Sequence, residues 1–329
     1  MNAGFGAVPI GDRPIIAPQF MDPNLAVGYN HHFNLNVQHQ LNNGLFFELG
    51  WLANMGHKLQ GGLGLNQVHP SRVGPATTQR DRPFPQFSNI TQLSAGIFNS
   101  SYHGLVLKVE KRFAGGLSFV SHYTWSKFLD DFAQSSLYNR QVNKGRSSDH
   151  VAGRFVFSGS YDLPFGKGRR FATKGPLAHL AGGWNLGALN IFQSGRALTP
   201  SATPNQCNCF SIGGVRPNLI GDPEGPKSIH NWFNVAAFEH PGPFRFGNSA
   251  PGVITGPGLW TLDVSLAKDI AFNERLKLNV RGDFYNLPNR ANFDNPILSI
   301  FPAGASGTTN VIRSAQDPRV IQLSARFLF

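Results

Sequence analysis

Two adjacent pairs of side chains in this sequence have the types that acid–base chemistry or metal binding would use. Asp130 and Asp131 are neighbouring carboxylates, and His31 and His32 are neighbouring imidazoles. The carboxylates end a predicted strand, so we expect them to diverge into a solvated loop. The histidines begin a predicted strand, where adjacent side chains point to opposite faces and cannot share an ion. The other histidines have no metal-ligand spacing either. We therefore predict no catalytic residue, no metal site, no cofactor and no enzyme activity.

The two cysteines of the chain lie in one short segment, Asn-Gln-Cys-Asn-Cys, as Cys207 and Cys209. A single intervening residue is a strained spacing for a disulfide. Two thiolates are also too few for a zinc site, which normally has four ligands. We interpret them as loop cysteines, either free or bridged in an oxidising compartment, and assign them no chemistry.

Charged residues recur at alternate positions of several predicted strands, and alternation places them on one face of each strand. They could contact a solute or a plug domain inside a barrel. The simpler interpretation is that they pair with one another across strands and keep a lumen wet. These lumen-facing candidates are Lys108, Glu110, Arg154, Asp263, Lys277, Arg281, Asp283 and Arg326.

The elements that would position these residues are hairpins with a period of two. Apolar and polar side chains alternate, and Gly-rich or Asn-rich turns follow residues 41 and 113, with a further turn at 272–275. Loops rich in Gly, Pro and Asn separate the hairpins. The predicted loops are 1–24, 56–90, 129–150 and 197–257. The predicted strands are 33–41, 45–51, 105–110, 117–125, 154–163, 184–193, 260–267, 276–285 and 319–329.

The connections alternate in length, with short turns at one end of the strands and long loops at the other. This asymmetry is typical of membrane barrels, and a soluble β-sandwich has no reason for it. No apolar run approaches the roughly 20 residues of a transmembrane helix. The mean hydropathy of −0.19 would suit a soluble chain, but only alternate residues of a barrel strand face lipid. We therefore predict an all-β, antiparallel transmembrane barrel.

The overall composition is basic, with a formal net charge of +11 and only 14% charged residues. Nucleic-acid binding would require a clustered basic patch or a known motif. The basic residues are instead spread over turns and strands, so we do not predict a nucleic-acid partner. They suit a lumen lining or contact with anionic lipid head groups.

The last predicted strand, 319–329, alternates and ends in an aromatic residue at the carboxyl terminus. It resembles the signal by which assembly machinery recognises bacterial outer-membrane barrels. The alternative is an ordinary edge strand of a soluble sheet. The residues of the predicted assembly signal are Ile321, Leu323, Ala325, Phe327 and Phe329.

Several motifs along the chain resemble the C-terminal barrel of TonB-dependent receptors, in particular the Oar-like type. The resemblance covers nearly the whole chain. Its main motifs are Tyr-His-Gly-Leu-Val-Leu-Lys-Val-Glu-Lys-Arg-Phe at 102–113, Tyr-Thr-Trp-Ser-Lys at 123–127, Asp-Leu-Pro-Phe-Gly-Lys-Gly-Arg-Arg at 162–170, Arg-Pro-Asn-Leu at 216–219, Trp-Phe-Asn at 232–234, Gly-Asp-Phe-Tyr-Asn-Leu-Pro-Asn at 282–289 and Ala-Gln-Asp-Pro-Arg at 315–319.

The resemblance implies a 22-stranded barrel with an N-terminal plug, energised through a TonB box. The sequence departs from that pattern, because it contains no plug, no N-terminal β-domain, no TonB box and no signal peptide. It supplies about nine or ten strands. We expect residues 1–329 to be the C-terminal segment of such a barrel. Outer-membrane lipid and the assembly machinery are the expected partners, and the TonB system would act only through the missing N-terminal part.

We expect a location in the cell outer membrane and a role in the uptake of a large solute of the glycan or siderophore class. The alternative is a structural or adhesive surface protein on the same scaffold, with the loops at 56–90 and 197–257 as its working parts.

Overall fold

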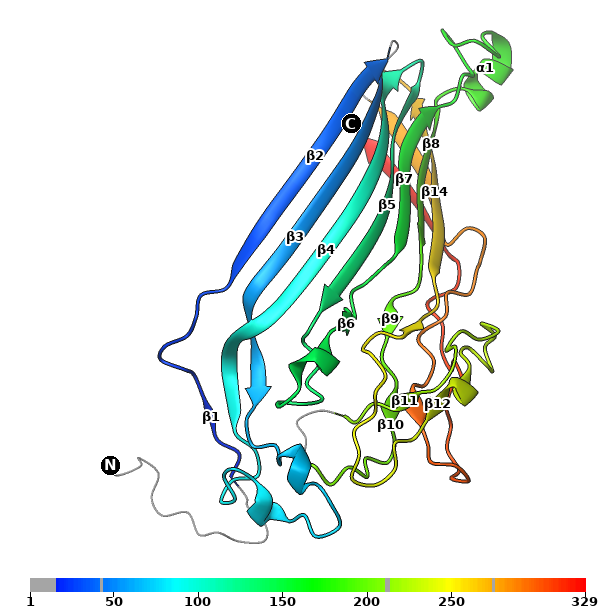
Figure 1. The fold of residues 1–329 in the computed structure, drawn as a ribbon. Coiled ribbons are helices and arrows are strands. Elements are labelled where there is room, and N and C mark those ends of the chain that lie inside the picture. The colour runs from blue at the N-terminus through cyan, green and yellow to red at the C-terminus, as the bar shows by residue number, and fades with distance from the viewer. Residues whose placement is uncertain (1–15, 42–43, 211–213, 274–275) are drawn as a thin grey trace.

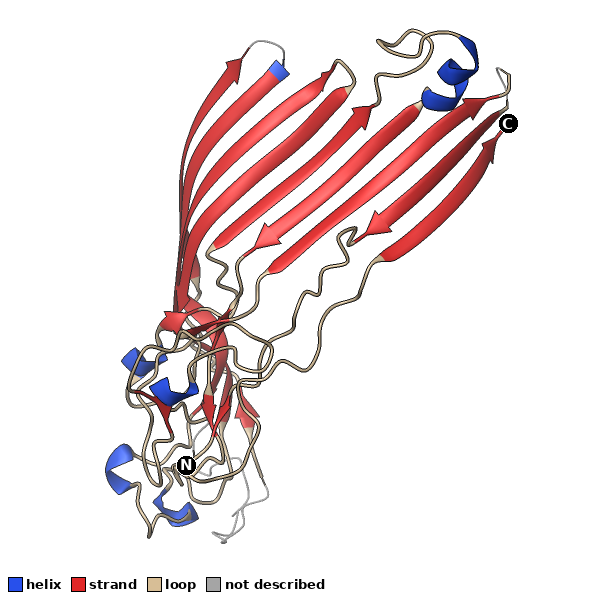
Figure 2. Cartoon of the chain, turned by 90° about the vertical axis from the view of Figure 1, so that its right-hand side faces the viewer, coloured by secondary structure: helices blue, strands red, loops and turns tan. Residues whose placement is uncertain are grey.

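The computed structural model describes residues 16–41, 44–210, 214–273 and 276–329. Its main element is one curved antiparallel sheet in which nine long strands follow one another in chain order (Figures 1 and 2). Each of these long strands pairs antiparallel with the long strands that precede and follow it in the chain. The strands are β2 (Tyr29–Leu41), β3 (Leu45–Gly64), β4 (Thr91–Ala114), β5 (Leu117–Asp130), β7 (Gly153–Asp162), β8 (Trp184–Gln193), β14 (Leu259–Ala271), β15 (Lys277–Tyr285) and β17 (Val320–Leu328).

The strand register separates the side chains of the sheet into two faces. Leu107 lies opposite Leu49 and Tyr123 on the neighbouring strands, whereas Lys108 lies opposite Glu48. Directly opposed residues point to the same side of a sheet, so one face is mainly apolar and the other mainly polar. We call them the apolar face and the polar face. Large side chains exposed on the apolar face include Leu49, Trp51, Leu105, Leu107, Trp125, Phe192, Val280, Leu323 and Phe327.

The connections at one end of the sheet, which we call the turn rim, are mostly tight. Gly115 and Gly116 join β4 to β5 with φ angles of 63° and 86°. Two successive positive φ values suit the right-handed twist of the flanking strands, and glycine adopts them without steric cost. The connection between β7 and β8, residues 163–183, is longer and contains the helix α1 (Gly175–Ala181). The described part of the chain has no helix long and apolar enough to cross a bilayer.

The connections at the opposite end, the loop rim, pack against one another into what we call the loop unit. It comprises residues 65–90, 131–152, 194–258 and 286–319, within the described ranges (Figure 1). Its main core joins two of these connections, 194–258 and 286–319, and consists of Leu198, Trp232, Phe233, Ala237, Phe238, Ile254, Ile300 and Ile312. Three short pairs support it: β9 (Ala197–Leu198) with β13 (Ile254–Thr255), β10 (Ser201–Ala202) with β16 (Ser299–Ile300), and β11 (Asn218–Leu219) with β12 (Phe238–Glu239).

Two further short strands lie beside the main sheet. β1 (Gln19–Phe20) pairs in parallel with the start of β4, so the described end of the predicted loop 1–24 is partly strand. β6 (Gly145–Arg146) pairs with the end of β5, inside the predicted loop 129–150. These pairings involve two residues each and contain no apolar alternation that a sequence pattern could show.

The predicted hairpins are confirmed, and several predicted boundaries are wrong. Residues 56–64 belong to β3 and residues 91–104 to β4, although the first range was assigned to a loop. Register shifts between Gly56 and Leu63 interrupt the alternation there. The predicted loop 197–257 contains short strands. The turn residues 42–43 and 274–275, and residues 1–15 of the first predicted loop, lie outside the described residues.

Candidate functional site

A polar depression of about 360 Å³ lies on the polar face of the sheet, beside the loop rim. Four neighbouring strands, β4, β5, β7 and β8, form its floor. The loop unit contributes the remaining wall. We call it the basic depression because its cations outnumber its single carboxylate. It is lined by Tyr102, His122, Thr124, Ser126, Asp149, Val151, Arg154, Gln193 and Arg196.

The strand register fixes the floor of the basic depression. Arg154 on β7 lies directly opposite Thr124 on β5 and Gln193 on β8. His122 lies opposite Lys108 on β4. Because opposed residues share a face, these side chains all project from the polar face, and their spacing is set by the backbone hydrogen bonds of the sheet.

Two arginines give the basic depression its charge. Arg196 comes from the loop unit, and its Nη1 lies 3.3 Å from Oδ1 of Asp149. Both partners are largely exposed, at 60% and 71%, so water screens this pair and leaves the guanidinium free for further bonds. Arg154 forms no ion pair with any residue that the structure describes. A planar guanidinium without a carboxylate partner is suited to bind carboxylate, phosphate or catecholate oxygens in two-point contacts.

The other predicted lumen-facing residues also lie on the polar face, but their ion pairs differ from the expectation. Nζ of Lys108 lies 2.8 Å from Oε2 of Glu110, and Nη2 of Arg281 lies 2.8 Å from Oδ1 of Asp283. Both pairs run along one strand, so the expectation that these residues pair across strands is wrong for them. Residues two apart share a face and are close enough for long side chains to meet.

The remaining predicted lumen-facing residues each have different neighbours on the polar face. Oδ1 of Asp263 accepts a hydrogen bond from the backbone N–H of Asn286 at 2.8 Å, which ties the end of β15 to β14. Arg326 lies opposite Asn279, and Lys277 lies opposite Leu328, both near the turn rim. Of the eight predicted residues, only Arg154 lines the basic depression.

Sequence reasoning did not identify most of the basic depression. Arg196 and Asp149 are 47 positions apart and meet only because the loop unit folds back. His122 and Tyr102 lie within recognisable strands, but the residues that surround them come from other strands and from loops. The only available signal was the alternation, which places Tyr102, His122 and Arg154 on the same face of adjacent strands.

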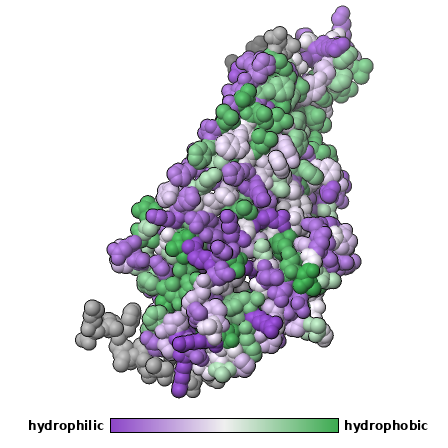
Figure 3. Space-filling view, in the orientation of Figure 1, coloured by the Kyte–Doolittle hydropathy of each residue, from purple (hydrophilic) through white to green (hydrophobic). Residues whose placement is uncertain are grey.

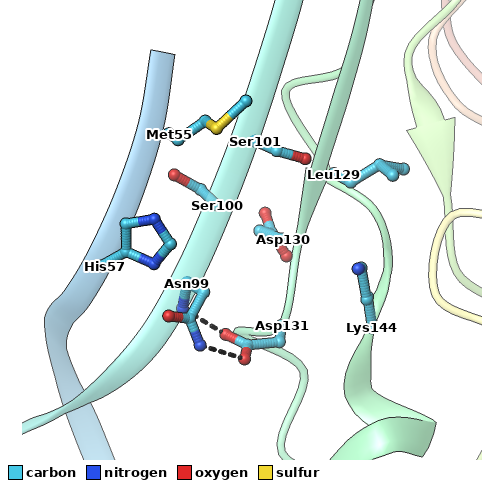
Figure 4. A pocket seen from close by; sticks show the side chains of 9 residues that line it. All are labelled: Met55, His57, Asn99, Ser100, Ser101, Leu129, Asp130, Asp131 and Lys144. Atoms are coloured by element: carbon cyan, nitrogen blue, oxygen red, sulfur yellow. Dashed lines mark hydrogen bonds between the residues drawn. The ribbon is translucent and has the colours of Figure 1, made fainter. Parts of the chain in front are cut away.

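The carboxylate pair noted in the sequence lines a cavity of about 300 Å³, which is bordered by the interiors of β3 and β4 and by the end of β5 (Figure 4). Asp131 accepts hydrogen bonds from N and Nδ2 of Asn99, at 2.7 and 3.1 Å, and pairs with Arg140. Oδ1 of Asp130 accepts instead from the backbone N–H of Phe132 at 3.3 Å. The two carboxylates therefore have different structural partners, and their geometry is that of a loop anchor.

A buried arginine links two connections of the loop unit, and a disulfide closes a short turn within one of them. Nε of Arg216 donates to the carbonyl of Ser249 at 2.7 Å, and its other nitrogens donate to Oγ of Ser135 and to the carbonyl of Val142. Burial lowers the pKa of Arg216 from its ordinary value, yet an arginine remains charged. Cys207 and Cys209 are bonded to each other and buried, which decides between the two interpretations of these residues.

The protein belongs to the family described as outer membrane beta barrel domain, whose model matches residues 2–322. No curated protein matches the sequence. Among solved structures, the chain is similar to the pyoverdine outer membrane receptor FpvA from Pseudomonas aeruginosa (12% identity, 92% of this chain and 30% of that chain, TM-score 0.46). It is also similar to BauA, the ferric preacinetobactin receptor from Acinetobacter baumannii (11%, 91% and 29%, 0.47), and to the outer membrane transporter YddB from Escherichia coli (9%, 94% and 34%, 0.46).

The family places the chain in the cell outer membrane and confirms the predicted antiparallel outer-membrane barrel fold. In such barrels the apolar face meets lipid, and the polar face lines the lumen. Short turns lie on the periplasmic side and long loops outside the cell, so the turn rim is periplasmic and the loop rim is extracellular. The chain spans about a third or less of the length of the similar solved proteins. The Oar-like subtype stays a prediction.

Proposed function

We propose that this chain is the C-terminal barrel segment of a TonB-dependent receptor that takes up a large solute of the glycan or siderophore class. One observation carries the proposal: the basic depression opens on the lumen face beside the extracellular loops. Arg154 and Arg196 provide positive charge there, and Tyr102 and Gln193 add neutral hydrogen-bonding groups. This combination suits an oxygen-rich anionic solute that enters from outside.

The two edges of the sheet support the assignment to a larger barrel. Every residue of β2 and of β17 is exposed, and each strand pairs on one side only within the described residues. Unpaired backbone groups are not tolerated in lipid, so both edges require further strands. We infer that residues 1–329 close a barrel together with strands from outside this sequence. A plug and a contact with TonB would belong to that remaining part.

The exposed apolar residues of β17 support the predicted assembly signal. Leu323 is 79% exposed and Phe327 is 58% exposed, and both lie on the lipid-facing side. An assembly factor could bind this edge by strand addition, with alternate side chains as the specific contacts. We assign the chain no catalytic role.

Uptake by cells that contain the complete barrel tests the proposal. The probes are radiolabelled ferric citrate, for the siderophore class, and fluorescent maltodextrin, for the glycan class. We expect energy-dependent accumulation of one probe. Arg154→Gln combined with Arg196→Gln should lower its initial rate, at a probe concentration well below saturation, by at least about a hundredfold, since each charged hydrogen bond contributes roughly 1.5–3 kcal/mol. Lys277→Gln with Arg326→Gln, at the other end of the lumen, is the matched control. Failure to accumulate either probe, or recovery of the chain from the cytosol, would contradict the proposal.

A second candidate function is adhesion at the cell surface, and the loop unit favours it. A set of extracellular loops with its own buried core presents a fixed surface, whereas loops that only admit a solute need no such core. Cells with and without the protein would be compared for binding to abiotic and cellular surfaces. Loss of binding without loss of uptake of either probe would support adhesion over transport.

A further inference from the structure

The connection between β7 and β8, residues 163–183, differs from the other connections of the turn rim. It is long, and it contains no Asp or Glu. We call it the rim segment. It presents exposed apolar side chains beside exposed cations: Phe165, Phe171, Leu177 and Leu180 with Lys167, Arg169, Arg170 and Lys174. Hydrophobic and hydrophilic surfaces accordingly lie side by side at the corner where α1 is found (Figures 1 and 3).

Contacts from the sheet hold α1 beside the lipid-facing surface. Lys268 on β14 lies opposite Trp184 and Val280, which places it on the apolar face. Its Nζ donates to the carbonyls of His179 and Leu180 at 2.7 and 2.6 Å and lies 5.2 Å from the Trp184 ring centroid. The carbonyls at a helix C-terminus favour a cation. A lysine on a lipid face is costly unless it is covered and bonded, and α1 satisfies both conditions.

The outward side of α1 is apolar and lacks a protein partner among the described residues. Leu177 is 68% exposed and Leu180 is 71% exposed. Residues three apart in a helix are neighbours on its surface, so the two leucines form one patch. The patch lies at the periplasmic rim next to the lipid-facing sheet, where the acyl chains of the inner leaflet end.

The cations of the rim segment are available for a ligand. Lys167 and Lys174 form no ion pair or hydrogen bond with any residue that the structure describes. Arg170 lies 5.3 Å from the Phe171 ring centroid. Arg169 pairs with Asp162 at 3.1 Å and remains 46% exposed. An apolar patch bordered by unpaired cations is the pattern of segments that lie in a membrane interface and attract anionic head groups.

We propose that the rim segment binds the phosphate head groups of anionic phospholipids in the inner leaflet and thereby anchors the periplasmic rim of the barrel. Leu177 and Leu180 insert at the boundary of the acyl chains. Lys167 and Lys174 contact the head groups. The proposal depends on the outer-membrane location of the chain and is independent of the transported solute.

Fluorescence quenching in reconstituted membranes tests this proposal. The complete barrel, with Leu177→Cys in this chain, is extracted from outer membranes and labelled with an environment-sensitive fluorophore. The Cys207–Cys209 disulfide keeps the native thiols of this chain unreactive. Phosphatidylcholine vesicles then contain equal mole fractions of either brominated phosphatidylglycerol or brominated phosphatidylcholine. We expect both lipids to quench, with phosphatidylglycerol enriched about fivefold near the label from the attraction of basic side chains to anionic lipid.

Charge variants identify the residues responsible for the enrichment. Lys167→Gln with Lys174→Gln should lower the phosphatidylglycerol enrichment to about onefold. Quenching should persist, because Leu180 and the apolar label at position 177 remain. Lys127→Gln with Lys144→Gln removes the same charge at the extracellular rim and should leave the enrichment unchanged. Heat-modifiable migration in gels shows that each variant keeps its folded barrel.

Three results would overturn the proposal. Absence of quenching by either lipid would show that the patch does not reach the bilayer. Equal quenching by the two lipids in the labelled protein that retains Lys167 and Lys174 would show contact without head-group recognition. A label that is shielded in whole outer membranes but unquenched in vesicles would assign the segment to a periplasmic protein partner instead.

Discussion

Large apolar side chains are exposed along the sheet and buried in the loop unit, and the two regions therefore depend on different surroundings. Trp125 and Phe192 on the sheet are 63% and 55% exposed, whereas Phe233 in the loop unit is 0% exposed. The exposed set requires lipid as its solvent. The loop unit excludes water by itself, as a soluble domain does.

Charged side chains, like the apolar ones, can be exposed on the sheet and buried in the loop unit. On the sheet, charged side chains such as Arg281 remain half exposed in the lumen. In the loop unit, Arg216 is 5% exposed, and backbone carbonyls accept its hydrogen bonds. Hydrogen bonds in a buried region contribute more, and their loss costs more, than exposed ones. Single substitutions should therefore lower the stability of the loop unit strongly and that of the sheet only weakly.

The largest effect is expected from Phe233→Ala, which removes a fully buried ring from the main core. We expect the loop unit to lose about 3–5 kcal/mol of stability, measured as faster amide hydrogen exchange in residues 194–258. Sheet peptides should exchange as before. Phe192→Ala on the lipid face is the control and should leave loop exchange unchanged. Faster exchange in both regions of Phe233→Ala would show that they unfold as one cooperative unit.

Arg216→Leu should cause the second-largest loss of stability in the loop unit. The leucine keeps most of the apolar volume but leaves the buried acceptors of Ser249, Val142 and Ser135 without a donor, at a cost of about 3 kcal/mol. Amide hydrogen exchange in residues 194–258 again measures this loss of stability. Arg245→Leu removes an exposed arginine from the same connection and is the matched control. Equal effects of the two substitutions would assign the loss to net charge rather than to the buried hydrogen bonds.

The sheet was largely predictable from the sequence, because each strand carries its own alternating pattern. Residues 184–193 were predicted as a strand and form β8 over the same range. The alternating pattern does not predict the part of β3 that extends toward the loop rim. Register shifts near Gly56 and Gly61 interrupt the alternation there. Helix α1 also escaped prediction, because a helix of seven residues is too short to show a helical period.

The core of the loop unit could not be predicted for a different reason. Its contacts join segments that are remote in the sequence. The backbone N–H of Trp232 donates to Oδ1 of Asn310 at 2.7 Å across 78 positions. Neither residue belongs to a periodic element, so no local pattern indicates that they meet. The same holds for Arg196 in the basic depression, which joins the site only through the folding of the long connection.

The stability of the loop unit should also depend on pH, because the unit contains His150. Burial, and then the charges of Arg146 and Lys127, lower the pKa of His150 from its ordinary value of 6.5. Nδ1 of the ring accepts a hydrogen bond from the backbone N–H of Phe128 at 3.2 Å, which requires that nitrogen to be unprotonated. When the loop unit opens, His150 regains its ordinary pKa and takes up a proton more readily than in the folded state.

The stability that neutral His150 supports is therefore complete above pH 6.5 and is lost as the pH falls below that value. Hydrogen exchange of the loop unit, corrected for intrinsic rates, should accelerate between neutral pH and about pH 5. His150→Gln should flatten this dependence. His230→Gln, at an exposed position of the same unit, is the control. An unchanged pH dependence in His150→Gln would assign the titration to another group.

The smallest effect is expected from Arg281→Gln on the lumen face. Its Nε donates to both carboxylate oxygens of Asp283, at 2.8 and 2.9 Å, but the arginine is 50% exposed. Lumen water screens such a pair, so its loss should cost less than about 1 kcal/mol. The temperature at which the barrel loses its heat-modifiable migration should hardly change. A shift as large as that of a buried core substitution would mean that a plug or a solute covers this pair in the complete barrel and removes it from water.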